Sequence, residues 1–206
     1  MGGEIPKQFI EICGKPILRH TIEKFLEVDE DIRVIIVLPP DYLKYWKDYN
    51  RANNFLDRYI LAEGGITRFH SVQNALRYVE DGSVVAVHDA VRPFAGADLI
   101  RRLFEEAETS PAVVPALPVI DSLREISGDG SVPVDRSRFI VVQTPQVFQS
   151  DILKAAYGQA YSQAFTDDAS VVEAYGCGIK LVPGERSNFK ITTREDLPLA
   201  SALLGH

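Results

Sequence analysis

The residues best suited to phosphate chemistry follow a buried-strand pattern at residues 84–87. Four apolar residues there lead into His88 and Asp89, and Arg92 follows just before Pro93. In an open α/β sheet, ligands bind beyond the carboxyl ends of the strands. Aspartate supplies the hard oxygen ligands that Mg²⁺ prefers, and the planar arginine side chain matches phosphate oxygens. The stretch predicts a site for a metal-bound phosphate ligand or, more simply, a strand-end turn with an incidental ion pair.

Other cationic residues and a glycine pair extend this set, which comprises Lys7, Arg92, Arg136, Lys190 and Gly64-Gly65. The glycine pair joins a strand pattern to a helix pattern, where backbone N–H groups can approach a nucleotide closely. The set suits nucleotidyl transfer, in which a phosphate oxygen attacks the α-phosphorus of a nucleoside triphosphate and pyrophosphate leaves. A phosphate monoester has a second pKa of roughly 6, so this nucleophile needs no protein base. Catalysis would then consist of alignment and charge neutralisation by Mg²⁺, lysine and arginine.

Several other classes of protein have little support. The Walker and dinucleotide-binding signatures are absent, and the four histidines show neither zinc-ligand spacing nor a nucleophile elbow. The net charge of −7 argues against a general nucleic-acid or anionic-membrane surface. The two cysteines, Cys13 and Cys177, lack metal-ligand spacing and indicate a reducing compartment. Since no apolar run approaches roughly 18 residues and no signal peptide begins the chain, we expect a cytoplasmic protein without membrane or nucleic-acid partners.

The elements expected around these residues alternate between strand and helix, which predicts a parallel sheet covered by helices on both faces. The 206 residues, 46 % apolar and 25 % charged, fit one globular domain. Strands are expected at residues 32–38, 59–63, 84–87, 112–117, 139–142, 179–182 and 189–192. Helices are expected at about residues 16–26, 41–50 with Asp41 as cap, 69–79, 98–108, 150–161, 166–176 with Thr166 as cap, and from Thr193 onward.

The pattern changes between residues 118 and 140. Residues 121–126 alternate polar and apolar, residues 127–130 have turn chemistry, and residues 132–136 form a second short strand pattern. We expect a projecting hairpin. Because an isolated hairpin is marginally stable in water, it should pack against a partner subunit or, alternatively, fold over its own domain. The chain is thus interpreted as one domain, residues 1–206, with an arm at about 118–140, which the family resemblance given next implies is a dimerising arm.

Six motifs follow one another along the chain: Pro6-Lys7-Gln8-Phe9; Gly64-Gly65 with Arg68, Ser71-Val72 and Asn74-Ala75-Leu76; His88-Asp89-Ala90-Val91-Arg92-Pro93; Thr144-Pro145-Gln146; Thr166-Asp167-Asp168-Ala169-Ser170; and Lys190-Ile191-Thr192. Together they closely resemble the 2-C-methyl-D-erythritol 4-phosphate cytidylyltransferase family, over essentially the whole chain. The resemblance implies a Rossmann-like nucleotidyltransferase of the glycosyltransferase-A type, with a mostly parallel sheet between helices. It further implies a homodimer joined through its β-arms. The reaction implied is CMP transfer from CTP to methylerythritol phosphate with Mg²⁺, giving 4-diphosphocytidyl-2-C-methyl-D-erythritol and pyrophosphate in non-mevalonate isoprenoid biosynthesis.

The resemblance also implies a role for each matching residue. Lys7 would stabilise charge on the transferring phosphate, and Lys190 would hold phosphate and aim the attacking substrate. The residues expected to contact CTP are Gly64, Gly65, Ser71, Asp89 and Ala90, with Asp89 also at the metal. Those expected around the methylerythritol phosphate are Arg92, Thr144, Thr166 and Asp167, together with Ser122 and the catalytic residue Arg136 of the partner subunit's arm.

The sequence departs from the family pattern at the start of the chain. The family normally begins with a strand and a glycine-rich loop ending in Arg-Met-Gly, whereas this sequence starts at Met1-Gly2. We expect that upstream residues were omitted, because losing a central strand would leave backbone groups of its neighbours unpaired. In the arm, Ser122 stands where a threonine is expected, and the hydroxyl is retained.

Two alternatives remain. Ribitol-5-phosphate cytidylyltransferase shares the arm, the chemistry and the type of motif found at residues 88–93, although residues 71–76 and 166–170 resemble the methylerythritol enzyme more closely. A non-catalytic nucleotide-binding subunit is an alternative from a different class.

Overall fold

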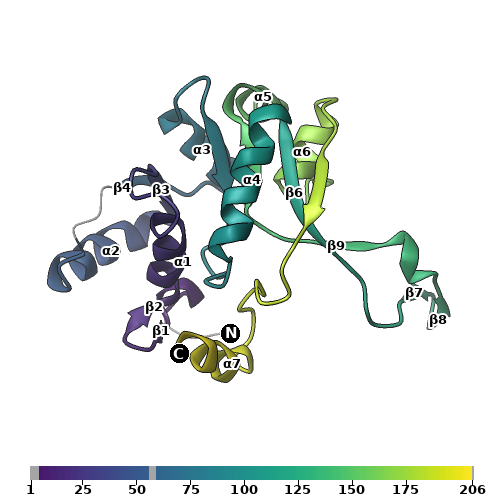
Figure 1. Cartoon of the computed structure of the whole chain (residues 1–206), viewed down its shortest axis with the longest axis horizontal. Helices are drawn as coiled ribbons and strands as arrows, with labels where there is room; N and C mark the ends of the chain where they lie inside the picture. Colours follow the sequence, from purple (N-terminus) through teal and green to yellow (C-terminus); the bar gives the residue numbers. More distant parts are fainter. Residues whose placement is uncertain (1–4, 56–58, 206) are drawn as a thin grey trace.

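The computed structural model describes residues 5–55 and 59–205; Met1-Gly2, which matches the end of the family's glycine-rich loop, lies outside these ranges. Figure 1 shows strands surrounded by helices and one hairpin that projects from the body. The strands are β1 (Glu11–Ile12), β2 (Lys15–Pro16), β3 (Val34–Leu38), β4 (Tyr59–Glu63), β5 (Val84–Val87), β6 (Ala112–Pro118), β7 (Arg124–Ser127), β8 (Gly130–Pro133), β9 (Ile140–Val142), β10 (Gln146–Gln149) and β11 (Lys180–Pro183). The α-helices are α1 (Ile17–Leu26), α2 (Pro40–Ala52), α3 (Arg68–Ala75), α4 (Ala97–Thr109), α5 (Ser150–Ala156), α6 (Asp168–Ala174) and α7 (Asp196–Leu204). Short 3-10 helices are η1 (Lys7–Phe9), η2 (Leu76–Tyr78) and η3 (Arg136–Arg138).

The largest sheet has the order β11-β6-β10-β5, with β9 also paired to β6. Strand β11 is parallel to β6, whereas β10 is antiparallel to both β5 and β6. Strands β5, β6 and β11 therefore share one direction, in agreement with the expected α/β fold, and β10 is inserted in reverse. The sequence analysis missed β10 because only Val147 and Phe148, between two glutamines, carry an apolar signal.

Helices cover both faces of this sheet, because successive strand side chains point to opposite sides. Helix α4 packs on one face, in a buried cluster that contains Leu99, Leu103, Ala107, Val113, Val147 and Val182. Helices α3, α5 and α6 cover the other face, where the cluster contains Phe69, Val72, Ala112, Phe148, Leu153 and Val172. The adjacent residues Val147 and Phe148 thus belong to opposite layers, and the predicted two-sided covering is confirmed.

The first third of the chain forms a second layer around the parallel pair β3-β4. Helices α1 and α2 pack against this pair through Leu18, Ile22 and Trp46, and Phe9 of η1 joins the same buried cluster. The side chain of Trp46 is only 1 % exposed. Trp46 therefore belongs to the core, and its ring and that of Tyr42 contact Phe9 of η1, which positions the 3-10 helix that carries Lys7.

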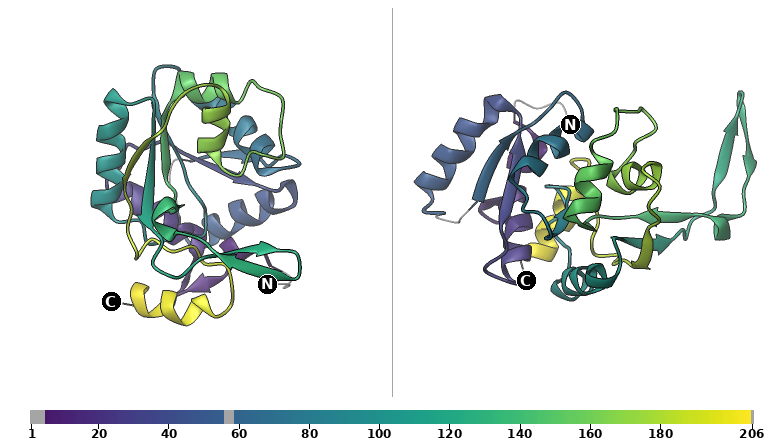
Figure 2. Two further views of the ribbon diagram at one scale, coloured as in Figure 1. Left: turned by 90° about the vertical axis from the view of Figure 1, so that its right-hand side faces the viewer. Right: turned by 90° about the horizontal axis from the view of Figure 1, so that it is seen from above.

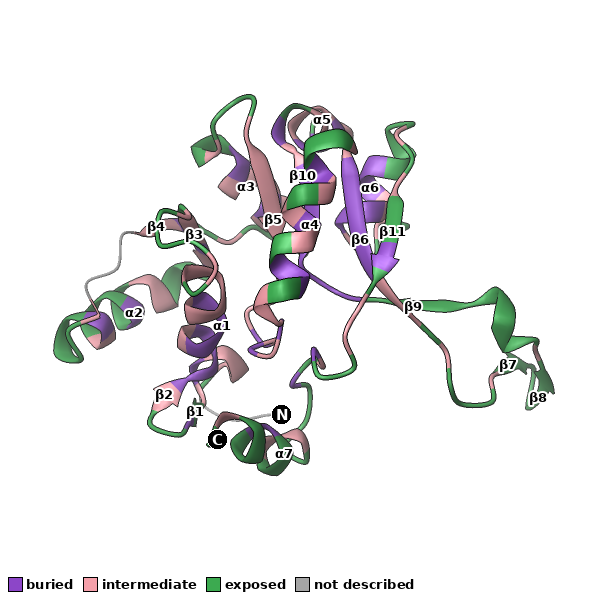
Figure 3. Ribbon diagram, viewed as in Figure 1, coloured by how far each residue is buried: buried purple, intermediate pink, exposed green. Residues whose placement is uncertain are grey.

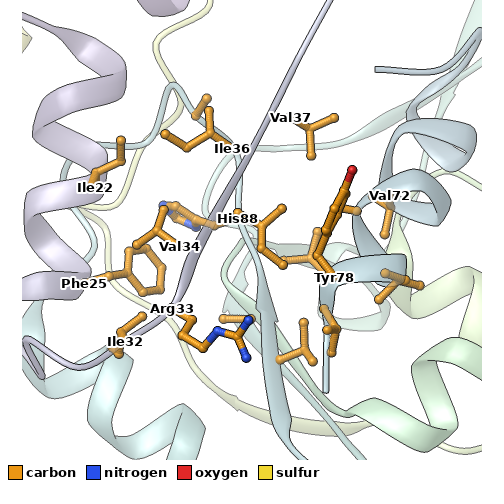
Figure 4. Close-up of a pocket in the computed structure, with 18 of the residues that line it drawn as sticks. Ile22, Phe25, Ile32, Arg33, Val34, Ile36, Val37, Val72, Tyr78 and His88 are labelled. Carbon is orange, nitrogen blue, oxygen red and sulfur yellow. The ribbon is translucent and has the colours of Figure 1, made fainter. Parts of the chain in front are cut away.

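A pocket of about 670 Å³ lies between β3 and β5, which are not paired with each other. Figure 4 shows that its labelled lining is mostly apolar, including Val34 and Ile36, with His88 also reaching it. Residues of both strands line the pocket along their lengths, and residues of α1, α3 and η2 contribute much of the remaining wall. The pocket thus separates the β3-β4 pair from the five-stranded sheet.

Four local expectations are wrong. Helix α2 begins at Pro40 with Pro39 as N-cap, so Asp41 lies in the first turn and does not cap; proline suits this position because its missing N–H has no helical partner. Helix α5 ends at Ala156, since Tyr157 and Gly158 close a tighter turn. Asp167, not Thr166, caps α6. Residues 189–192 form no strand. Ile191 N–H donates to the Val91 carbonyl (2.9 Å), but Val91 lies in a loop, and the neighbouring residues add no further strand pairing.

The arm projects as an exposed hairpin (Figure 2). Strands β7 and β8 pair antiparallel, and every residue of β7, β8 and β9 is exposed. The alternative of a flap folded over its own domain is therefore wrong for this structure. Large apolar side chains on this segment are open to solvent, namely Ile120, Ile126, Val132, Phe139, Ile140 and Val141.

No helix within the described ranges combines the length and the apolar character that crossing a membrane requires.

Candidate active site

The loop after β5 holds Asp89 at the carboxyl end of that strand, as the sequence predicts. The hydroxyls of two buried threonines fix its backbone. The Asp89 N–H donates to the Thr144 hydroxyl (3.1 Å), and the Thr21 hydroxyl donates to the Ala90 carbonyl (3.0 Å). The side chain of Thr144 is therefore occupied in supporting the loop, so its expected contact with substrate stays a prediction.

The Asp89 carboxylate lies between two cations. Its Oδ2 accepts a hydrogen bond from Arg92 Nε (3.0 Å) and lies 3.1 Å from Lys190 Nζ. Burial by itself would raise the pKa of Asp89, but the charge of Lys190 and the bond from Arg92 outweigh it and lower that pKa below its usual value. The carboxylate is therefore ionised at neutral pH and holds both cations at one point.

Burial lowers the pKa of the neighbouring His88 to about 4, although the Arg92 carbonyl beside its Nε2 (3.0 Å) favours the protonated ring. The imidazole is thus neutral at neutral pH and adds no positive charge to the site. Its Nδ1 is buried and has no hydrogen-bond partner among the described residues. His88 packs beside the site, in an edge contact with Phe25 (ring centroids 5.1 Å apart).

Asn188 is a supporting residue that the sequence analysis missed. Its side chain is fully buried, and its Nδ2 donates to the Thr144 carbonyl (2.8 Å). The backbone carbonyl of Asn188 accepts hydrogen bonds from Arg92 Nη1 (2.9 Å) and from Gln143 Nε2 (3.1 Å). Asn188 thus joins three of the segments that carry predicted site residues. The one signal in the sequence is its position two residues before Lys190.

We expect Asn188→Ala to destabilise the fold by about 2 kcal/mol, because the buried Thr144 carbonyl loses its donor and a small cavity opens. The same change should raise KM for the phosphate acceptor more than KM for CTP, since Arg92 shifts with the loop. Urea unfolding and steady-state kinetics measure the two effects. An exposed asparagine serves as the control in Asn53→Ala, because it bonds only the Tyr49 carbonyl of its own helix. Equal changes in the two proteins would show that Asn188 has no special role.

The glycine turn follows β4 and leads into α3, and it brings Gly64, Gly65 and Ser71 together as expected. Gly64 N–H extends the β3-β4 pairing to the Leu38 carbonyl (2.8 Å), and Gly65 N–H donates to the Ser71 hydroxyl (3.0 Å). A Cβ on Gly65 would lie 2.4 Å from the Cβ of His70, so only glycine fits this position. Ser71 therefore closes the turn that is predicted to contact the nucleotide.

The turn before α6 carries the other predicted substrate residues. Asp167 accepts the Ser170 N–H in a capping box (2.9 Å) and also the Gln146 side chain (2.7 Å), so both of its carboxylate oxygens have protein partners. The buried Gln146, which the sequence analysis noted only as part of a motif, also accepts the Ala169 N–H (2.9 Å). Thr166 is exposed, and no described residue bonds its hydroxyl. Thr166 is thus better placed than Asp167 to contact a ligand.

Three predicted residues are not brought into contact with these groups. Lys7 lies in η1 and forms no ion pair with any residue that the structure describes. Ser122 and Arg136 are exposed on the arm, which extends away from the body (Figures 1 and 3), and Arg136 Nη1 donates to the Ile120 carbonyl. The expectation that they complete the site of a partner subunit is untested by a single chain.

A divalent cation at this site would be held mainly by its phosphate ligands. In the described part of the chain, no three His, Cys, Asp or Glu side chains are grouped as a metal cage. Asp89 Oδ1, however, has no donor among the described residues, while Oδ2 holds the two cations. A single free carboxylate oxygen fits Mg²⁺, which usually takes one or two carboxylates plus substrate phosphates.

The mixed α/β fold, with a cation-flanked aspartate at a strand end beside a glycine turn, is that of a nucleotidyltransferase. A sequence profile for 2-C-methyl-D-erythritol 4-phosphate cytidylyltransferase matches residues 1–206, and the chain belongs to this family. It is 48 % identical to the enzyme of this name from Phocaeicola vulgatus over 204 residues, covering 99 % of this chain and 93 % of the relative. It is 45 % identical to that from Porphyromonas gingivalis, covering 99 % and 91 % of the two chains.

Solved structures agree with this assignment. The crystal structure of 2-C-methyl-D-erythritol 4-phosphate cytidylyltransferase from Thermus thermophilus superposes with a TM-score of 0.80 at 35 % identity, covering 98 % of this chain and 95 % of the other. That from Francisella tularensis gives 0.83 at 30 % identity, with 97 % and 94 % covered. The predicted fold, the predicted family and the predicted enzyme class, a cytidylyltransferase, are confirmed.

Proposed function

We propose that this protein transfers CMP from CTP to 2-C-methyl-D-erythritol 4-phosphate and releases pyrophosphate, as a step of non-mevalonate isoprenoid biosynthesis. The observation that carries the proposal is the position of Asp89 between Arg92 and Lys190, in a chain of this family. The bond that forms joins an acceptor phosphate oxygen to the α-phosphorus of CTP. The bond that breaks joins that phosphorus to the oxygen that bridges it to the β-phosphate.

Alignment of two anions is the main task of the protein in this reaction. The acceptor phosphate is largely a dianion at neutral pH, so no side chain has to remove a proton. Lys190 and Arg92, held on one carboxylate oxygen, neutralise the repulsion between acceptor and triphosphate, and Lys7 stabilises charge on the transferring phosphate. Gly64, Gly65 and Ser71 position the cytosine, while Thr166 contacts the acceptor.

Mg²⁺ bound at Asp89 Oδ1 would neutralise triphosphate charge. Asp89 is the residue that would hold it, and Arg92 and Lys190 would contact the phosphates that complete its coordination.

We also propose that residues 118–140 of a single domain form a dimerising arm in a cytoplasmic homodimer. The support is the exposed apolar surface of the arm, where the side chain of Ile126 is 85 % exposed. Such surface on a projecting hairpin is typical of a segment that packs against a second subunit. In the dimer, Ser122 and Arg136 of the partner subunit would complete each site.

We further propose that the site requires a strand and glycine-rich loop upstream of Met1, as the family resemblance implies. The support is the apolar pocket between β3 and β5, which contains one buried unpaired ring nitrogen of His88. An extended segment between these strands can pair with both, and it would end close to Asp89.

The experiment that tests these proposals is pyrophosphate release from CTP and Mg²⁺, with methylerythritol phosphate or ribitol 5-phosphate as the acceptor. Both this chain and one extended by the upstream strand and loop are assayed. We expect turnover with methylerythritol phosphate in the extended chain and little in this one. Turnover with ribitol phosphate alone would indicate the sister activity. CTP binding without turnover in the extended chain would indicate a non-catalytic nucleotide-binding subunit.

A further inference from the structure

An ion pair between a partly exposed arginine and a fully buried carboxylate joins the two turns that flank the proposed site. Arg68 is the first residue of α3, directly after the glycine turn, and Asp168 is the first residue of α6, directly after Thr166 and Asp167. Arg68 Nη2 donates to Asp168 Oδ2, and the Tyr157 hydroxyl donates to Asp168 Oδ1 at 2.5 Å. The Asp168 side chain is completely buried, so both of its oxygens depend on these two donors.

The charges in this cluster are mutually dependent. Burial would lower the pKa of Arg68, but the charge of Asp168 outweighs this effect and raises that pKa. Burial raises the pKa of Tyr157, and the charge of Asp168 raises it further, so the hydroxyl remains protonated and stays a donor. Removing Arg68 would leave a buried carboxylate without a counter-charge, which is costly. Arg68 is therefore the cation that compensates this buried carboxylate.

The cluster also has a rigid apolar backing. Phe69, the next residue of α3, stacks on the Tyr157 ring with centroids 4.7 Å apart, and it stacks on Phe165 at 5.6 Å. Phe165 immediately precedes Thr166. Helix α3 is thus attached to the α6 turn both by an ion pair and by stacked rings. The Arg68 side chain is partly exposed, and it lines the same pocket as Ser71 and Asp89.

We propose that Arg68 and Asp168 are positioning residues, which fix the glycine turn of the nucleotide against the Thr166 turn of the acceptor and so set the distance between attacking oxygen and α-phosphorus. The inference rests on the proposed function. Its physical basis is the steep dependence of transfer rates on alignment, for which a displacement of about 1 Å can cost about 100-fold. Neither residue needs to touch a substrate for this effect.

The test uses the active form of the enzyme, with the variants Arg68→Gln, Arg68→Lys and Asp168→Asn. We expect Arg68→Gln and Asp168→Asn to lower kcat about 100-fold, with a smaller change in KM for CTP, and Arg68→Lys to recover part of the loss because it keeps the charge. The matched control is Arg101→Gln, which removes an exposed arginine from its pair with Asp98 (2.9 Å). Assays are run well below the melting temperature of each variant.

Hydrogen–deuterium exchange provides a readout that does not depend on activity. We expect Arg68→Gln to speed exchange at residues 64–67 and 165–168 together, with strands β5, β6 and β10 unchanged. A wild-type kcat in a folded Arg68→Gln protein would overturn the positioning role, as would exchange that rises everywhere or in one turn alone. If the wild-type enzyme releases no pyrophosphate, the proposed function fails. The exchange result then still decides whether the pair holds the two turns together.

Discussion

Asp89→Asn should lower kcat/KM for CTP by about 1,000-fold in the active form of the enzyme. The carboxylate holds Arg92 and Lys190 on one oxygen, and asparagine keeps the shape of the side chain while removing its charge. The two cations would then repel each other, and the free oxygen would be a poor ligand for a divalent cation. Pyrophosphate release at several Mg²⁺ concentrations measures the loss.

Asp98→Asn is the matched control for this prediction. It removes the same charge from a carboxylate that is also paired with an arginine, but whose side chain is 93 % exposed, compared with 17 % for Asp89. We expect nearly unchanged kinetics, since exposed ion pairs contribute little. A folded Asp89→Asn enzyme with activity within tenfold of wild type would show that this carboxylate neither binds the metal nor orders the cations.

Mixing an Arg136→Ala subunit with a Lys7→Ala subunit should restore activity that neither variant has alone. Arg136 lies on the exposed arm and Lys7 in the body, so the dimer proposal places them in one site only when they come from different chains. Each mixed dimer then has one intact site. With random exchange, half of the dimers are mixed, and we expect about one quarter of wild-type activity.

The readout is pyrophosphate release after the two subunits have exchanged, with dimers verified by light scattering. The control mixes Arg136→Ala with Ser122→Ala, because these residues lie on the same arm and such a mixture restores no intact site. Failure to complement in verified dimers would mean that Arg136 acts within its own subunit or has no role. Complementation in the control would mean that the arm acts in some other way than by completing the partner's site.

The local pattern of residue types was enough to predict most elements of the fold. Strand β4 and helix α1 appear where the apolar periodicity places them, because a buried face requires a regular spacing of apolar residues. The loop at residues 88–93 was likewise recognisable, since its acid, its arginine and its proline are contiguous. Six ordered motifs then identified the family, which the comparisons confirm.

Local reasoning was wrong where neighbours along the chain compete for one role. Thr166 and Asp167 both have side chains that can cap a helix, and in the structure the capping box with Ser170 and the bond from Gln146 of β10 both engage Asp167. Strand β10 itself has too short an apolar run to be predicted, and it is stable because β5 and β6 supply partners on both of its edges. The segment around Lys190 has the residue pattern of a strand, but in the fold it lies next to the loop after β5 and not next to a strand.

The sequence by itself determined the class of fold, the chemistry of the Asp89 loop and the family, because these depend on contiguous residues and on periodicity. The tertiary structure alone decided that Lys190 meets Asp89, that Asn188 supports Arg92, and that Arg68 reaches Asp168. Each of these pairs joins distant segments of the chain. Their distances are set by how helices pack on the sheet, and no local pattern in the sequence records that packing.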